Sequence, residues 1–221
     1  MIPLTPLLNF VAFLLSGWVT ARLYYSYSQT KYPYIRSFYL CFVFTTLLFL
    51  FLSLPAFFPF PIASAVANLL AVLAGIPLEL LQYEHFTKKI LRAILGVGLI
   101  VTAALGVFFL EPFQAYPAGI FFFWSPPPFN PAWIVAGVLS FLFTFTGGIA
   151  FMRYGLKKKT DAYILRRSIL IGLSAILLGL TAAVSYIFAS VETFLAANVL
   201  SLLGLSTLGA AMLYKRQDNA Y

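Results

Sequence analysis

The stretch YILRRSILIGLSAILLGLTAAVSYIF, residues 163–188, decides the fold because it joins a basic start to a long apolar run. After Arg167 it carries no charged residue as far as Phe188. An α-helix of about 20 apolar residues spans the roughly 30 Å hydrocarbon core of a bilayer. The stretch therefore predicts a membrane-spanning helix whose first turn lies at a membrane surface.

The rest of the chain repeats this pattern. Of the 221 residues, 62% are hydrophobic and 9% are charged, whereas about a quarter of the residues in a soluble domain are charged. We predict one all-α integral membrane domain over residues 1–221, a bundle of seven transmembrane helices. The expected spans are 3–25, 37–57, 60–82, 89–110, 131–152, 164–188 and 191–214. The first has no basic start and is too long for a signal peptide, so we expect it to be retained.

The 14 Lys and Arg residues lie in or beside alternate connections. They accompany the first, third and fifth connections and the end of the last span, and they are absent from the N-terminal tail and the other connections. Cytoplasmic connections are enriched in Lys and Arg, so we predict an N-terminus outside and a C-terminus in the cytoplasm. The net charge of +8 then reflects topology and attraction to anionic membrane lipids, and we expect no nucleic-acid partner.

Small residues at helical spacing predict which faces pack, because helices in lipid associate by close approach. They form ridges in the fifth span (Ala136, Ser140, Thr144, Gly148) and in the sixth (Gly172, Ala175, Gly179, Ala182). The second span is rich in phenylalanine and has no such ridge. We expect it to face lipid or a partner subunit.

The third span contains a candidate intramembrane site. Small residues recur every four positions over 63–75, and one further step of four reaches Glu79. We therefore expect Glu79 to point into the bundle near the cytoplasmic surface, with Gln82 and Tyr83 as helical neighbours. An inward carboxylate in a membrane helix indicates function. The alternative is a glutamate that reaches interfacial water or is neutralised by nearby Lys and Arg.

Asn68 and Asn198 are polar groups expected near mid-membrane. We expect them to form hydrogen bonds between helices, at about 1 kcal/mol each, rather than to line a substrate path. No charged residue is expected near the midplane, which disfavours ion-coupled transport. A channel or carrier for a neutral solute stays open.

The connection EPFQAYPAGIFFFWSPPPFNPAW, residues 111–133, is the longest, and its six prolines exclude a regular helix or central strand. The apolar run Phe121, Phe122, Phe123 and Trp124 predicts that it lies in the outer interface or folds over the bundle. It is a candidate ligand-binding or partner-binding loop, and an interfacial anchor is the alternative.

A basic patch is predicted on the cytoplasmic side, where it could bind an acidic partner or anionic lipid headgroups, or act only as a topology determinant. Its members are Lys157, Lys158, Lys159, Arg166 and Arg167.

We expect no cofactor, no metal and no enzymatic activity. Retinal would need a lysine inside the seventh span, which has none. The only histidine, His85, cannot supply paired haem ligands, and with scattered carboxylates it makes no site of three or four ligands.

The layout resembles the seven-helix sensor modules at the N-terminus of some bacterial histidine kinases. It shares a basic turn after the first helix, a long outer loop after the fourth, and paired Arg166 and Arg167 before a leucine-rich helix. The resemblance implies a receptor-like sensor in a prokaryotic plasma (inner) membrane. Only YKRQDNAY follows the seventh span, so we expect any output domain to belong to another chain.

Three functions are therefore kept. The composition favours a non-catalytic accessory or structural subunit of a larger membrane complex, with protein partners in the membrane. A receptor-like sensor that signals through a separate partner is second, and a channel or carrier for a neutral solute is third.

Overall fold

The structure is a computed structural model that describes residues 4–54, 66–67, 69–77, 80, 89–104, 114–118, 121–125, 131–158, 160–188 and 191–214. Its helices are α1 (Leu4–Thr30), α2 (Pro33–Ser53), α4 (Lys89–Ala104), α5 (Pro131–Lys157), α6 (Ala162–Phe188) and α7 (Val191–Leu213). Residues 66–67 and 69–77, within the third expected span, are also helical. Two short strands, β1 (Gln114–Ala118) and β2 (Phe121–Ser125), form an antiparallel hairpin.

Five of these helices, α1, α2, α5, α6 and α7, are long and apolar enough to cross a membrane. The chain is thus a polytopic, mainly helical membrane protein. The third and fourth expected spans extend beyond the described residues, so the count of seven stays a prediction.

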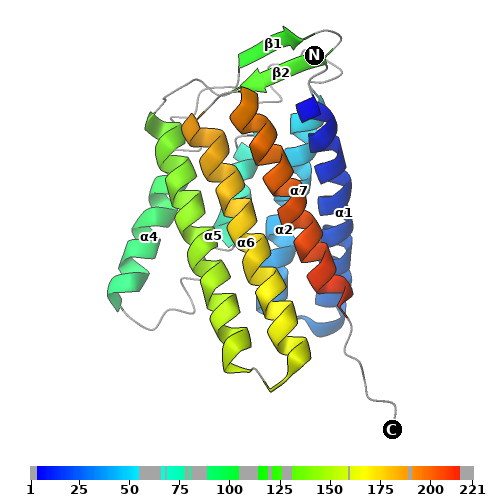
Figure 1. The fold of residues 1–221 in the computed structure, drawn as a ribbon. Helices are drawn as coiled ribbons and strands as arrows, with labels where there is room; N and C mark the ends of the chain where they lie inside the picture. The colour runs from blue at the N-terminus through cyan, green and yellow to red at the C-terminus, as the bar shows by residue number, and fades with distance from the viewer. Residues whose placement is uncertain are drawn as a thin grey trace.

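Helices that pack on each other are α4 with α5, α5 with α6, α6 with α7, α7 with α1, and α1 with α2, and α2 lies behind α6 and α7 in the view of Figure 1. α5, α6 and α7 run alternately up and down, and α1 packs on both α7 and α2. Phe38 of α2 also meets Phe151 of α5, with ring centroids 5.7 Å apart. α4 lies at the edge of the bundle beside α5.

Two short connections at one end of the bundle reverse the chain. After α1, Lys31 has a left-handed φ of 56°, and its N–H donates to Tyr27 O at 2.8 Å. Such a residue ends a helix while still satisfying a carbonyl of its last turn. Before α6, Asp161 Oδ1 accepts the N–H groups of Tyr163 and Ile164 at 3.0 and 3.1 Å. A cap of this kind stabilises a helix start by about 1 kcal/mol.

α5 and α6 pack along a seam of small residues. Residues that face each other across it are Gly137 and Tyr186, Thr144 and Gly179, Gly148 and Gly172, and Gly155 and Ser168. The expected burial is confirmed for Ala136, Gly148, Gly172 and Gly179, whereas Ser140, Thr144, Ala175 and Ala182 are half-buried. The seam brings the two backbones close enough for strong van der Waals packing.

A cluster of buried side chains joins α1, α2, α7 and the helical segment 69–77. It contains Ala12, Val19, Cys41, Phe42, Phe49, Ala74, Leu205 and Leu208. Because Phe42 and Phe49 are only 4% and 7% exposed, the expectation that α2 faces lipid or a partner is wrong for this face. The sequence of α2 has no ridge of small residues, so it did not reveal this packing.

The hairpin occupies the long connection between α4 and α5 and lies at the end of the bundle opposite the α5–α6 turn, with β2 near α1 (Figure 1). Its register pairs Gln114 with Ser125 and Ala118 with Phe121. The prolines of residues 111–133 exclude a strand in the middle of a sheet, but they do not exclude one at its edge. In a two-stranded hairpin both strands are edges, which is where a residue such as Pro117 is tolerated.

Candidate functional site

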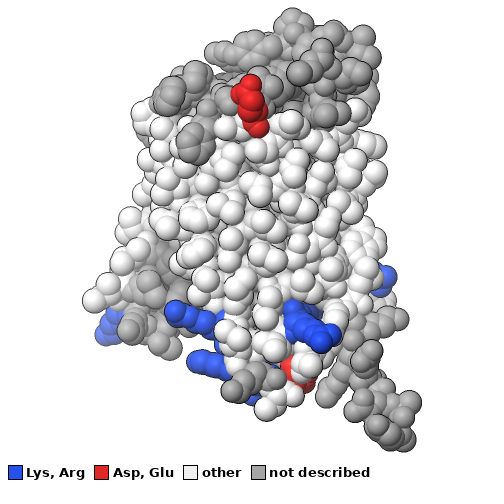
Figure 2. All heavy atoms as spheres, in the orientation of Figure 1, with Lys and Arg blue, Asp and Glu red and all other residues white. Residues whose placement is uncertain are grey.

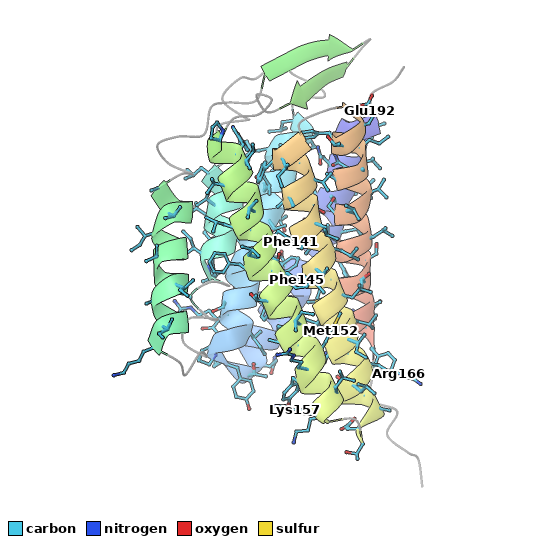
Figure 3. The ribbon with its side chains drawn as sticks, turned by 60° about the vertical axis from the view of Figure 1, so that its left-hand side comes forward. Phe141, Phe145, Met152, Lys157, Arg166 and Glu192 are labelled. Atoms are coloured by element: carbon cyan, nitrogen blue, oxygen red, sulfur yellow. The ribbon has the colours of Figure 1, made fainter. Side chains whose placement is uncertain are left out.

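Charge divides the molecule into two ends (Figure 2). We call the end that holds the α1–α2 and α5–α6 turns the basic end. The described Lys and Arg residues near it are Arg22, Lys31, Arg36, Lys89, Arg153, Lys157, Lys158, Arg166 and Arg167. Glu192, at the start of α7, marks the opposite end, whereas Lys157 and Arg166 lie at the basic end (Figure 3).

Two arginines and two tyrosines form what we call the Arg–Tyr cluster at the basic end. Arg166 Nη1 donates to Tyr214 OH at 3.0 Å, which links the start of α6 to the residue after α7. Arg167 Nη1 donates to Tyr163 OH at 2.6 Å, and its guanidinium lies 5.7 Å from the centroid of that ring. The Tyr163 and Tyr214 rings stack with centroids 5.9 Å apart. The two guanidinium groups are therefore held by aromatic partners while both arginine residues remain exposed.

The predicted basic patch is only partly a cluster. Lys157 and Lys158 lie exposed at the end of α5 and in the turn that follows, and Lys159 lies outside the described residues. The two tyrosines were missing from the prediction. Tyr163 is four residues before Arg167, a spacing that brings side chains together on a helix. Tyr214 is 48 residues from Arg166, so no local pattern could have found it.

Among the described residues, the hydroxyl groups of Thr20 and Ser174 form hydrogen bonds between helices. Thr20 Oγ1 of α1 lies 2.9 Å from Thr46 Oγ1 and 3.0 Å from Phe42 O, both of α2, and 2.8 Å from Ser16 O of its own helix, so its one O–H is shared among these partners. Ser174 Oγ of α6 donates to Gly204 O of α7 at 2.8 Å.

Asn198 is buried, but its Nδ2 donates within α7, to Phe194 O at 2.7 Å. This donor serves its own helix, whereas a bond to another helix was expected. Threonine and serine in a helix ordinarily bond to the carbonyl of their own preceding turn, so their sequence positions do not predict bonds to another helix.

Several candidate residues lie outside the described part of the chain, namely Asn68, Glu79, Gln82 and Tyr83. The ridge that led to Glu79 is buried at Ala67 and half-buried at Gly75. The inward orientation of Glu79 stays a prediction. Phe121, Phe122, Phe123 and Trp124 lie in β2, so the structure places their backbone in the hairpin.

α4 presents an outward apolar face. On its inner side, a Cβ built on Gly98 would lie 2.6 Å from Cζ of Phe143, so the glycine lets α4 approach α5. Its exposed large side chains are Ile90, Ile94, Val97, Ile100 and Val101, which we call the α4 stripe. Ile90 is 78% exposed and Ile100 is 68% exposed, and every member is β-branched.

Within the described residues, no three His, Cys, Asp or Glu side chains come together as a metal site. Cys41 is a buried free thiol in α2. His85 lies outside the described residues.

Compared with models of known families, with curated proteins and with solved structures, the chain has no significant match. The resemblance to sensor modules therefore stays a prediction.

Proposed function

We propose that this polytopic membrane protein is a non-catalytic accessory or structural subunit of a larger membrane complex, and that the α4 stripe binds a transmembrane helix of a partner protein. The observation that carries the proposal is the outward exposure of the stripe on a helix at the edge of the bundle.

The spacing of the stripe supports a helical partner. Ile90, Ile94, Val97 and Val101 alternate by four and three positions, which is the heptad spacing at which side chains of one helix insert between those of another. β-branched side chains have few rotamers in a helix, so they lose little entropy when they pack. Exposed faces of other helices share this spacing, and what sets the stripe apart is that every member is β-branched.

The use of polar groups supports a structural role over a carrier. The hydroxyls of Thr20 and Ser174 bond to carbonyls of neighbouring helices, and the Asn198 amide bonds within its own. The two hydroxyls link neighbouring helices, as polar groups commonly do in membrane bundles.

We further propose seven spans with the N-terminus outside and the basic end in the cytoplasm. The accumulation of described Lys and Arg at one end supports this orientation, because cytoplasmic segments retain positive charge.

The test places a photoreactive amino acid at Val97 in the full chain, in its own membrane. We expect one protein adduct of defined mass, whose protein also copurifies with the untreated chain at a fixed ratio. The matched control is Leu203 on α7, which is also exposed and apolar and should give lipid adducts only. The same adducts from both positions, or lipid adducts alone at Val97, would contradict the proposal.

A sensor is the second candidate, and the Arg166–Tyr214 hydrogen bond favours it. Because the bond joins the start of α6 to the end of α7, a shift of α7 would move the basic α5–α6 turn. A partner protein bound to that turn would then respond to the shift. A sensor predicts that breaking this link with Tyr214→Phe changes the output of a partner while complex formation is unchanged. If the chain is a structural subunit, Tyr214→Phe should not change the output of a partner while complex formation stays unchanged.

A further inference from the structure

We propose that the Arg–Tyr cluster binds the headgroup phosphate of an anionic phospholipid in the adjoining leaflet. The inference does not depend on the identity of a protein partner. It rests on the placement of two arginines, on their charge surroundings and on the apolar surface beside them.

The arginines are preorganised for a phosphate. A guanidinium carries five N–H donors, and each described bond to a tyrosine hydroxyl occupies one of them. The hydroxyl bond fixes the Arg166 side chain, and the bond and ring of Tyr163 fix that of Arg167. Little side-chain freedom is then lost on binding, and arginine suits the geometry of phosphate oxygens.

The surroundings are electropositive. Lys157 and Lys158 are exposed at the turn just before α6. The carboxylate of Asp161 lies in the same connection, but its Oδ1 accepts two backbone N–H groups at the start of α6. The cations therefore outnumber this carboxylate at the turn, and an anionic headgroup would be attracted.

An apolar surface begins directly beside the cluster. On α6, Ile169 and Leu173 follow Arg166 by three and seven positions, so they share its helix face, and both are exposed. On α7, Leu213 precedes Tyr214 and is 56% exposed. Acyl chains would lie along these side chains while the phosphate meets the arginines. This juxtaposition favours a phospholipid over a soluble phosphate or an acidic protein.

The position of the Arg–Tyr cluster at the ends of two spans also matches the depth of a lipid headgroup in the membrane. Tyr163 lies in the first turn of α6, and Tyr214 directly follows α7. Tyrosine rings at span ends are typical of the membrane interface, where lipid phosphates lie.

The experiment measures lipid retention by native mass spectrometry of the full chain in detergent, with phosphatidylglycerol or phosphatidylcholine added at equal concentration. We expect preferential retention of phosphatidylglycerol by the wild-type chain. Arg166→Gln should lower that retention about tenfold, the loss expected for a charge-assisted hydrogen bond to phosphate. The matched control, Arg153→Gln, removes an exposed positive charge from α5 at the same end and should change retention less than about twofold.

A second variant guards against a folding defect. Tyr214→Phe keeps the stacked ring and removes only the hydroxyl that holds Arg166, so it should fold and lower phosphatidylglycerol retention about threefold, less than Arg166→Gln does, because the guanidinium remains and loses only one of its positioning contacts. Equal losses in Arg166→Gln and Arg153→Gln would overturn the proposal, because they would indicate diffuse attraction. Equal retention of the two lipids would also overturn it. So would displacement of phosphatidylglycerol by equimolar inorganic phosphate, which would identify a site for the free anion.

Discussion

Gly148 of α5 and Gly172 of α6 meet backbone to backbone. A Cβ on Gly148 would lie 2.6 Å from the carbonyl oxygen of Gly172, and a Cβ on Gly172 would lie 2.5 Å from that of Gly148. Real Cβ atoms do not approach other atoms so closely, so neither position has room for a side chain. The α5–α6 seam depends on both glycines.

Gly148→Val should therefore separate α5 from α6 and destabilise the folded protein by at least about 2 kcal/mol, as overpacking does in a close-packed interior. Thermal unfolding in detergent measures the effect. The control is Gly147→Val, which makes the same change at the half-exposed neighbouring position and should cost less. Equal destabilisation by the two variants would contradict the described seam.

The seam also shows how far sequence can predict packing in this chain. Ridges of small residues on the fifth and sixth spans predicted the buried faces, because small residues allow close approach whatever lies opposite. The rule gave no guide for α2, which has no such ridge yet buries Phe42 and Phe49 on one face. A pattern within one helix cannot show what its neighbour supplies.

The α1–α2 contact makes a separate prediction about hydroxyl groups. Thr20→Val removes the hydroxyl that lies within hydrogen-bond distance of Phe42 O and Thr46 Oγ1, and valine keeps the shape of the side chain. We expect a loss of about 0.6 kcal/mol, the average for hydrogen bonds between membrane helices. Stability in a double-mutant cycle with Thr46→Val should show non-additive losses. Thr207→Val removes a hydroxyl that bonds only within α7 and serves as the control. Strict additivity at Thr20 and Thr46 would contradict the contact.

The orientation predicts which positions react with a membrane-impermeant thiol reagent. In a Cys41→Ala background, Thr160→Cys in the α5–α6 turn should react only from the cytoplasmic side, because Thr160 is exposed at the basic end. Glu192→Cys, at the start of α7, should react only from outside. Labelling of intact cells and of inverted vesicles measures both. A reversed pattern would refute the proposed orientation, and labelling of both positions from one side would refute the crossing between them.

The candidate sites were less predictable than the packing. The basic residues of the α5–α6 turn were found from charge alone, but the arrangement that organises Arg166 depends on Tyr214, which only the fold brings near. The α4 stripe was also missed. Its sequence reads as one more apolar span, and only the placement of α4 at the bundle edge shows which face is turned outward. Glu79, the strongest candidate from sequence, lies outside the described residues.

Native mass and subunit analysis of the protein extracted gently from its own membrane tests the central claim most directly. We predict that the wild-type chain migrates with a defined partner at fixed stoichiometry. We also predict that Val97→Trp, which keeps the α4 stripe apolar but changes its shape, releases that partner, whereas Leu203→Trp on α7 retains it. Migration of the wild-type chain alone, or equal behaviour of the two variants, would contradict the claim that the α4 stripe binds a partner helix.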